Sequence, residues 1–241
     1  MEKGSREADD DEREPCCGEI MNYHCVLFDL DGTLVDTIED IAGAMNRALE
    51  CHGFPVLPVE RFPGMVGRGI GRLALDALPG DAKNEETARQ VAADAARFYT
   101  EKPLIHSKPY PGIRELVKTL GEMKVRTAVI SNKPDAITRL VVEGLFPAGS
   151  FRVVQGEKAG VPRKPDPSSV WEMLVRLDGS PRETVLAGDS EVDMETARNA
   201  GCFALGVSWG FRPRRILEEA GAALIVDRPE DILALIRETR I

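Results

Sequence analysis

The chain has 241 residues and is 43% hydrophobic, which is enough for one large domain or for a domain that carries an insertion. Its net charge is −9 and it has no basic run, which argues against a nucleic-acid partner, because phosphate backbones attract clustered Lys and Arg. No apolar run approaches the ~18 residues of a membrane-spanning helix. We therefore expect a cytoplasmic protein that has no membrane partner.

Residues 1–22 form an acidic, polar tail that has little to bury, so we expect it to be disordered. The tail lacks the basic start and apolar core of a signal peptide. Met21 immediately precedes the first predicted strand and is a candidate start of translation. The cysteines are odd in number and irregularly spaced, which favours a reducing compartment over a disulfide framework. They are Cys16, Cys17, Cys25, Cys51 and Cys202.

The first predicted strand, Val26 to Phe28, runs into two aspartates two residues apart, Asp29 and Asp31. Asp-Gly between apolar runs is also typical of a β-hairpin, but the apolar residues that follow are spaced by three and four, which favours a helix. These residues are Leu34, Ile38, Ile41, Met45 and Leu49. A calcium loop is excluded because it needs Gly and Glu at the positions of Leu34 and Asp40.

A segment without strand-like runs follows, from about Thr37 to His106. We predict that residues 37–107 form an all-helical cap domain inserted into an α/β core. That core comprises residues 23–36 and 108–241. The two connections, at Asp36-Thr37 and at 108–112, are expected to act as a hinge.

From Pro111 onward, predicted helices and strands alternate, which is typical of a three-layer, Rossmann-like α/β fold with a parallel sheet. Such sheets bind ligands at the carboxyl ends of their strands, where Asp29 and Asp31 are expected to lie. Strands are predicted at 127–130, 151–154, 184–187, 202–207 and 224–226. Helices are predicted at 112–120, from 134, at 170–177, around 194–197, near 216 and at 232–236.

Residues that could bind a phosphate group follow the predicted strand at 127–130 and occur again in the loop that contains Lys164. Ser131-Asn132 stands between a strand and a helix, where free N–H groups and a hydroxyl bind phosphate oxygens, although an ordinary helix N-cap is the alternative. Lys164 lies among three prolines just before a helix. Its ammonium is a compact point charge, which is expected to neutralise Asp29 and the phosphate. Its neighbour Arg163 is a competing candidate.

Two further aspartates occur in Gly-Asp-Ser-Glu-Val-Asp, residues 188–193, after the buried strand at 184–187. Asp189 stands at the end of that strand as Asp29 does at the first, so we expect the two carboxylates to share a cation. A helix N-cap is the alternative role for these carboxylates, and Asp193 suits it as well.

These four motifs, in this order, resemble those of the haloacid-dehalogenase superfamily of phosphohydrolases, and the resemblance covers Cys25 to Ile241. It implies a magnesium-dependent phosphomonoester hydrolase that acts on a small phosphorylated metabolite. In such enzymes the residue matching Asp29 becomes an aspartyl-phosphate, and the one matching Asp31 protonates the leaving group and then activates water.

The resemblance also implies the ligands of the metal and of the phosphate. Mg²⁺ is expected to bind Asp29, the backbone carbonyl of Asp31 and Asp189, while Asp193 orients this set or the lysine. The phosphate oxygens are expected to be held by Ser131, the N–H of Asn132 and Lys164. Asp36 matches a position that is usual in the superfamily and is expected to support the hinge.

The segment Val66–Leu73 resembles the cap segment of the phosphoglycolate phosphatase family. Its glycines do not fit the dinucleotide-binding pattern. Arg68 is a candidate bidentate clamp for a substrate carboxylate, and a solvated surface arginine is the equal alternative.

Other activities of the same superfamily stay open, namely a pyrophosphatase or a sugar-phosphate phosphatase. A β-phosphoglucomutase is disfavoured because Ile41 stands where those mutases have histidine, and a phosphonoacetaldehyde hydrolase because Lys83 suits its cap lysine poorly. A non-catalytic phospho-signalling module is disfavoured because Asp31 would speed loss of the phosphoryl group.

Overall fold

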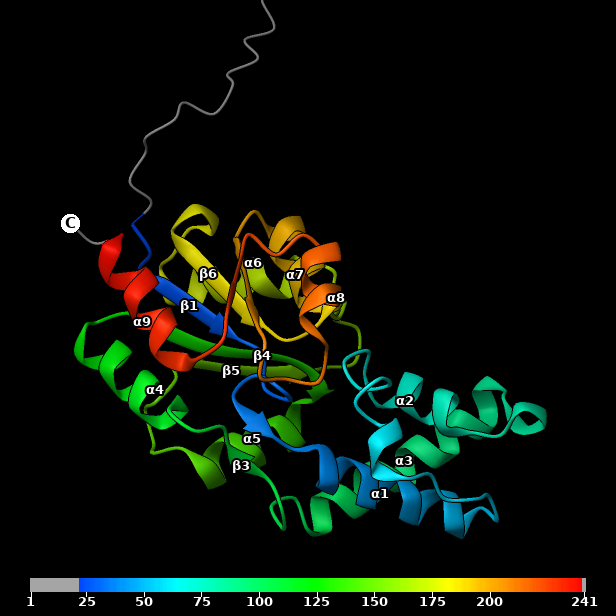
Figure 1. Ribbon diagram of the computed structural model, residues 1–241. Helices are drawn as coiled ribbons and strands as arrows, with labels where there is room; N and C mark the ends of the chain where they lie inside the picture. The colour runs from blue at the N-terminus through cyan, green and yellow to red at the C-terminus, as the bar shows by residue number, and fades with distance from the viewer. Residues whose placement is uncertain (1–21, 240–241) are drawn as a thin grey trace, which may run out of the picture.

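A six-stranded parallel sheet is the centre of the computed structural model, which describes residues 22–239 (Figure 1). The strand order is β5-β4-β1-β6-β7-β8. The strands are β1 Cys25–Phe28, β4 Arg126–Pro134, β5 Val153–Glu157, β6 Thr184–Gly188, β7 Phe203–Val207 and β8 Leu224–Val226. Of the predicted tail, all but Asn22 lies outside the described residues, and so do Cys16, Cys17 and Met21.

Helices cover both faces of the sheet, as the fully buried, apolar β1 requires. Val26 and Phe28 point to the core shared with one set of helices, and Cys25 and Leu27 to the core shared with the other. The first set is α4 Ile113–Glu122, α5 Asp135–Leu145 and α9 Pro229–Glu238, and the second is α6 Ser168–Leu177, α7 Glu191–Ala200 and α8 Arg214–Glu219. Each large side chain buried in this way contributes roughly 2 kcal/mol of stability. The predicted three-layer α/β fold is confirmed.

The inserted segment is helical, and Figure 1 shows its helices beside the sheet, away from the layers that cover it. They are α1 Ile38–Cys51, α2 Ile70–Ala77 and α3 Glu85–Glu101, with 3₁₀ turns at Val59–Arg61 and Gly80–Ala82. A third 3₁₀ turn, Pro181–Glu183, precedes β6. We propose the domain bounds expected from the sequence, with residues 37–107 as the cap and 23–36 plus 108–241 as the core.

The two connections to the insertion pair with each other. β2, Val35–Asp36, runs antiparallel to β3, Lys108–Pro109, and the carboxylate of Asp40 accepts hydrogen bonds from the backbone N–H groups of His106 and Ser107. The start and the end of the insertion are therefore tied together at one place, where a hinge is expected.

The helix predicted to include Leu34 begins later, at Ile38. The N–H groups of Leu34 and Val35 both bond to the carbonyl of Leu30 in a tight turn, and the chain then pairs as β2 before it becomes helical. The strand predicted at 151–154 is shifted to β5, because Phe151 leaves the ladder to pack edge-on against Phe146, with 5.3 Å between ring centroids.

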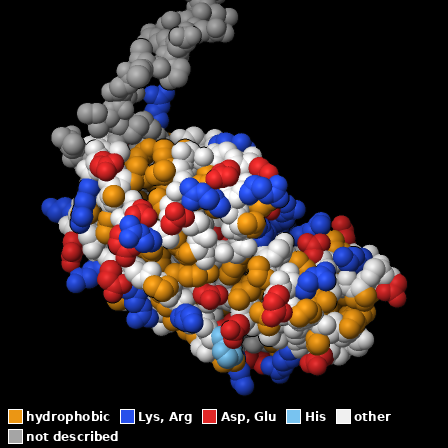
Figure 2. Space-filling model, in the orientation of Figure 1, with side chains coloured by type: hydrophobic (Ala, Val, Ile, Leu, Met, Phe, Trp, Pro, Cys, Tyr) orange, Lys and Arg blue, Asp and Glu red, His pale blue; other side chains and the backbone are white. Residues whose placement is uncertain are grey.

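Charged side chains of both signs are interspersed on the face that Figure 2 shows. None of the helices between residues 22 and 239 combines the length and the apolar composition that a membrane-spanning segment needs.

Candidate active site

Asp29 and Asp31 lie where β1 ends, and both are buried. The N–H of Asp29 continues the ladder to β6 by donating to the carbonyl of Ala187 at 2.9 Å. Gly32 follows with φ of +88°, and a Cβ there would overlap the carboxylate of Asp189. Only glycine lets this turn approach Asp189 so closely, and the turn brings the motifs of β1 and β6 together.

Lys164 joins the first motif to the last. Its ammonium is 2.6 Å from Oδ1 of Asp29 and 2.6 Å from Oδ1 of Asp193. The Asn132 side chain fixes the lysine backbone, because it accepts from the Lys164 N–H and donates to the Lys164 carbonyl, both at 2.9 Å. Arg163 instead pairs with Glu157 at 3.4 Å. Of the two competing candidates, the structure therefore brings Lys164 to the site.

Three buried carboxylates, Asp29, Asp189 and Asp193, offer oxygens that all lie within 4.8 Å of one another. Burial raises the pKa of Asp29 well above its usual range, Asp193 and Asp189 raise it further, and Lys164 opposes them. Burial also raises the pKa of Asp189 to about 7, with Asp193 adding to the effect and the N–H of Phe211 opposing it. A cation shared by these oxygens would relieve this crowding of negative charge, so the cluster suits a metal.

Asp193 is already committed to two other partners. Its Oδ2 accepts hydrogen bonds from the N–H of Ser190 at 3.1 Å and from the Ser190 hydroxyl at 2.6 Å, which completes the capping box of α7. Its Oδ1 holds Lys164. This geometry is compatible with the expected role of orienting the lysine and also with the alternative role at the helix N-terminus, and the role of Asp193 stays a prediction.

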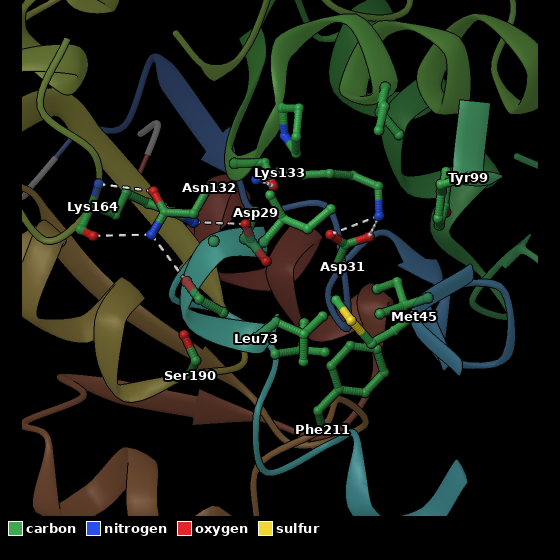
Figure 3. A pocket seen from close by; sticks show the side chains of 18 of the residues that line it. Asp29, Asp31, Met45, Leu73, Tyr99, Asn132, Lys133, Lys164, Ser190 and Phe211 are labelled. Carbon is green, nitrogen blue, oxygen red and sulfur yellow. Dashed lines mark hydrogen bonds and ion pairs between the residues drawn. The ribbon is translucent and has the colours of Figure 1, made fainter. Parts of the chain in front are cut away.

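Ser131 and Asn132 lie near the end of β4, beside β1, and line the same cavity as Asp29 and Lys164. Figure 3 shows Asn132 bonded to the backbone of Lys164, close to Asp29. The structure thus brings together the predicted catalytic, phosphate-binding and metal-binding residues of the core, namely Asp29, Asp31, Ser131, Asn132, Lys164, Asp189 and Asp193, whereas Arg163 and Asp36 do not line this cavity among the described residues. Residues 26–207 of the chain match the haloacid dehalogenase-like hydrolase family.

The chain belongs to the haloacid dehalogenase-like hydrolase family.

Relatives of known sequence and structure agree with this assignment. The chain is 31% identical over 207 residues to a phosphoglycolate phosphatase of Pseudomonas savastanoi, covering 84% of this chain and 75% of that protein. It is 32% identical over 222 residues to the phosphoglycolate phosphatase of Chromobacterium violaceum, covering 90% and 98%. The crystal structure of a proposed phosphoglycolate phosphatase from Lactobacillus delbrueckii superposes with a TM-score of 0.83 at 33% identity, covering 90% of this chain and 99% of that one.

The sequence-based prediction of a phosphatase of this superfamily is confirmed by these matches at the level of family and enzyme class. The roles predicted for single residues of the haloacid dehalogenase-like hydrolase stay predictions.

Lys133 also belongs to the site, although it was not among the residues predicted from the sequence. Its ammonium lies 3.0 Å from Oδ1 and 3.2 Å from Oδ2 of Asp31, and its side chain is 7% exposed. Thr37 donates to the same carboxylate at 2.7 Å. The signal was the position of Lys133, which directly follows Ser131-Asn132 at the predicted ligand edge of the sheet.

The loop before α2, residues 62–69, closes the site of this hydrolase from the side of the insertion. Core side chains bind four of its carbonyl groups: Arg212 binds those of Pro63 and Val66, Asn132 that of Gly67 at 2.9 Å, and Arg163 that of Arg68 at 3.2 Å. The cavity that remains over Asp29 has a volume of about 70 Å³. Its size suits a small substrate.

Arg68 itself does not line this cavity among the described residues. Its guanidinium pairs with Glu191 at 3.1 Å, and its side chain is 57% exposed. Glu191 also holds Arg212 at 3.0 Å, so Arg68 takes part in the contact between the loop and the core. Its predicted role as a clamp for a substrate carboxylate stays a prediction.

Proposed function

We propose that this chain is a magnesium-dependent phosphatase that hydrolyses 2-phosphoglycolate to glycolate and phosphate. The proposal rests on Asp29 and Asp31, which lie at the end of β1 and are each bound by a different lysine. Lys164 neutralises Asp29 at 2.6 Å, and Lys133 contacts Asp31 at 3.0 Å. Asp29 also lies among the carboxylates of Asp189 and Asp193, whereas Asp31 accepts a hydrogen bond from Thr37. Two carboxylates with such different neighbours suit two different tasks, nucleophilic attack and proton transfer.

In the proposed reaction, an oxygen of Asp29 attacks phosphorus and the bond from phosphorus to the glycolate oxygen breaks. Asp31 gives its proton to that leaving oxygen, so glycolate departs as the alcohol. Asp31 then takes a proton from a water molecule, whose oxygen attacks phosphorus and releases phosphate and free Asp29. Hydrogen bonds from Thr37 and Lys133 keep the Asp31 carboxyl in place for both transfers.

The phosphoryl oxygens are proposed to be held by Ser131, the N–H of Asn132 and Lys164, where negative charge accumulates during transfer. Mg²⁺ is proposed to bind Asp29, the backbone carbonyl of Asp31 and Asp189, with Asp193 in support. When bound, it supplies positive charge that draws the anionic phosphate toward the anionic nucleophile.

Relatives named phosphoglycolate phosphatase, with 28–32% identity, support the choice of substrate, together with the small cavity. The proposal is tested with a panel of 2-phosphoglycolate, pyrophosphate, glucose 1-phosphate and p-nitrophenyl phosphate. We expect a kcat/KM for 2-phosphoglycolate at least ~100-fold above the others, about 2.7 kcal/mol of transition-state preference. If all four compounds were hydrolysed with similar kcat/KM, the protein would be a phosphatase without this specificity. If kcat/KM were highest for pyrophosphate, the proposed substrate would be wrong and the protein would be a pyrophosphatase.

Mg²⁺ is expected to raise the melting temperature far more at about pH 8 than at about pH 5. The raised pKa values of Asp29 and Asp189 mean that the metal-free native state holds more protons than the unfolded chain between about pH 4 and pH 7. Its stability therefore falls as pH rises through this range, and the carboxylates become free to bind the cation.

Calorimetry with excess MgCl₂ or EDTA at both pH values measures this effect. Asp189→Asn is the matched control, because it removes one of the raised carboxyl groups. It should flatten the pH dependence of the metal-free protein and shrink the magnesium effect. An equal magnesium effect at both pH values would contradict the proposed site.

A further inference from the structure

The non-phosphate end of the cavity contains Lys133, whose only role so far is to hold Asp31, and a hydroxyl that the proposed chemistry leaves unused. Among the described residues, three cations line the cavity: Lys133, Lys164 and Arg212. Lys164 is shared between two carboxylates of the phosphate end, and Arg212 is bound to Glu191 and to carbonyls of the closing loop. Lys133 pairs with Asp31, the carboxyl group that is proposed to protonate the leaving group, and with none of the carboxylates at the phosphate end described here.

Tyr99, from α3 of the insertion, lies against Lys133. The lysine ammonium is 4.2 Å from the centre of the tyrosine ring, and Figure 3 shows it between Asp31 and Tyr99. The residue is 4% exposed, and within the described part of the chain its hydroxyl makes no hydrogen bond of ordinary geometry, although the side chains of Lys133 and Ser107 lie close to it. Ser107 is a polar neighbour of this hydroxyl, but its own hydroxyl donates to Asp40. A buried hydroxyl without a partner is costly, and a ligand that accepts from it removes that cost.

The surrounding wall is apolar, with Ile41, Met45, Leu73 and Ile137 among its residues. A leaving group that fits here therefore has a small apolar body and one anionic group. Asp31 is expected to protonate the leaving oxygen of the substrate, so that oxygen must lie beside the Asp31 carboxyl. The ammonium of Lys133 is 3.0 Å from the same carboxyl, so substrate atoms next to the leaving oxygen lie close to Lys133. In 2-phosphoglycolate a single methylene separates this oxygen from the carboxylate.

We propose that Lys133 and Tyr99 form the subsite for the substrate carboxylate, with Lys133 supplying the charge and the Tyr99 hydroxyl a hydrogen bond. This inference rests on the proposed function, since it names what selects a phosphorylated short-chain acid. One residue comes from the core and the other from the insertion. The subsite is therefore complete only when the insertion lies over the core, as it does here.

Binding of two phosphonates in the presence of Mg²⁺ tests the subsite without any turnover. 3-Phosphonopropionate has the shape of 2-phosphoglycolate, and propylphosphonate lacks its carboxylate. Calorimetric titration of the wild type should give a lower Kd for the carboxylated compound. Lys133→Met should reduce this preference at least ~10-fold and Tyr99→Phe about 3-fold to 5-fold. Arg72→Ala, at an exposed arginine that pairs with Asp76 and does not line the cavity, should leave it unchanged. Arg68→Ala tests the rival clamp.

The ratio of the two Kd values is the readout because Lys133→Met also disturbs Asp31 and is expected to slow turnover of every ester. An unchanged ratio in Lys133→Met, or no preference in the wild type, would overturn the subsite. Loss of the preference in Arg68→Ala would assign the carboxylate to Arg68 instead. Failure of the proposed function has a different signature, namely phosphonate binding with the expected preference but no hydrolysis of 2-phosphoglycolate.

Discussion

Asp29→Asn is expected to lower kcat by on the order of 10⁵-fold, about 7 kcal/mol of transition-state stabilisation. The amide has nearly the shape of the carboxylate but no charged oxygen to attack phosphorus. It also removes one of the three carboxylates within 4.8 Å of one another, so binding of Mg²⁺ is expected to weaken. Steady-state hydrolysis of 2-phosphoglycolate measures the first effect, and titration with Mg²⁺ the second.

The fold should tolerate this change. Burial and the nearby Asp193 and Asp189 raise the pKa of Asp29, which means that the protein environment disfavours its charge. A neutral side chain relieves that repulsion, and Lys164 keeps Asp193 as a partner. The metal-free variant should melt within a few degrees of the wild type.

A covalent intermediate provides an independent check on Asp29. Acid quenching of the wild type during turnover should trap a phosphoryl group on the peptide that contains Asp29, and the variant should show none. A variant that keeps activity within ~10-fold of the wild type would remove the covalent mechanism.

Much of the site followed from the sequence because it depends on local order along the chain. A short apolar run ending in Asp-x-Asp-Gly predicts both the buried strand and the place of Asp29 at its end. The same holds for Asp189 after β6. Since neighbouring parallel strands end at one edge of the sheet, their carboxylates had to meet there. The observed pairing of β1 with β4 and β6 is the geometry that this argument required.

Contacts that depend on the direction of long side chains could not be predicted from the sequence. The pairing of Lys133 with Asp31 spans 102 residues, and it depends on the irregular path of β4 after Ile130. Arg68 was singled out as a clamp from its place in a glycine-rich loop. Its guanidinium extends toward Glu191, because that loop is bound to the core through its backbone carbonyls. No pattern along the chain indicates this choice.

Lys164→Met is expected to destabilise the protein by about 3 kcal/mol or more and to lower kcat ~10³-fold. Burial opposes the charge of this lysine, but Asp193 and Asp29 outweigh it and raise the pKa of Lys164. The charge is thus firmly in place between two buried carboxylates. Its removal leaves both without their partner, and it removes a cation proposed to hold the phosphoryl oxygens.

The loss of stability should grow with pH. Without Lys164 the pKa of Asp29 rises further, because the lysine is what opposes the effect of burial, so the native state holds more protons than the unfolded chain near neutral pH. Stability then falls as pH rises, by the linkage of proton binding to unfolding. Urea unfolding at about pH 5 and about pH 8 measures the difference, with the larger deficit expected at the higher pH.

Arg163→Met is the matched control, because it removes a neighbouring cation that is 46% exposed, pairs with Glu157 and makes one of the four side-chain hydrogen bonds to the closing loop, but does not bind the carboxylates of the site. A surface change of this kind is expected to alter the free energy of unfolding by less than about 0.5 kcal/mol and kcat by less than ~3-fold. The two variants differ by one position in the chain and carry the same substituted side chain. Equal effects would mean that the charge of Lys164 has no special role, whereas a deficit confined to Lys164→Met places that charge at the centre of both stability and catalysis.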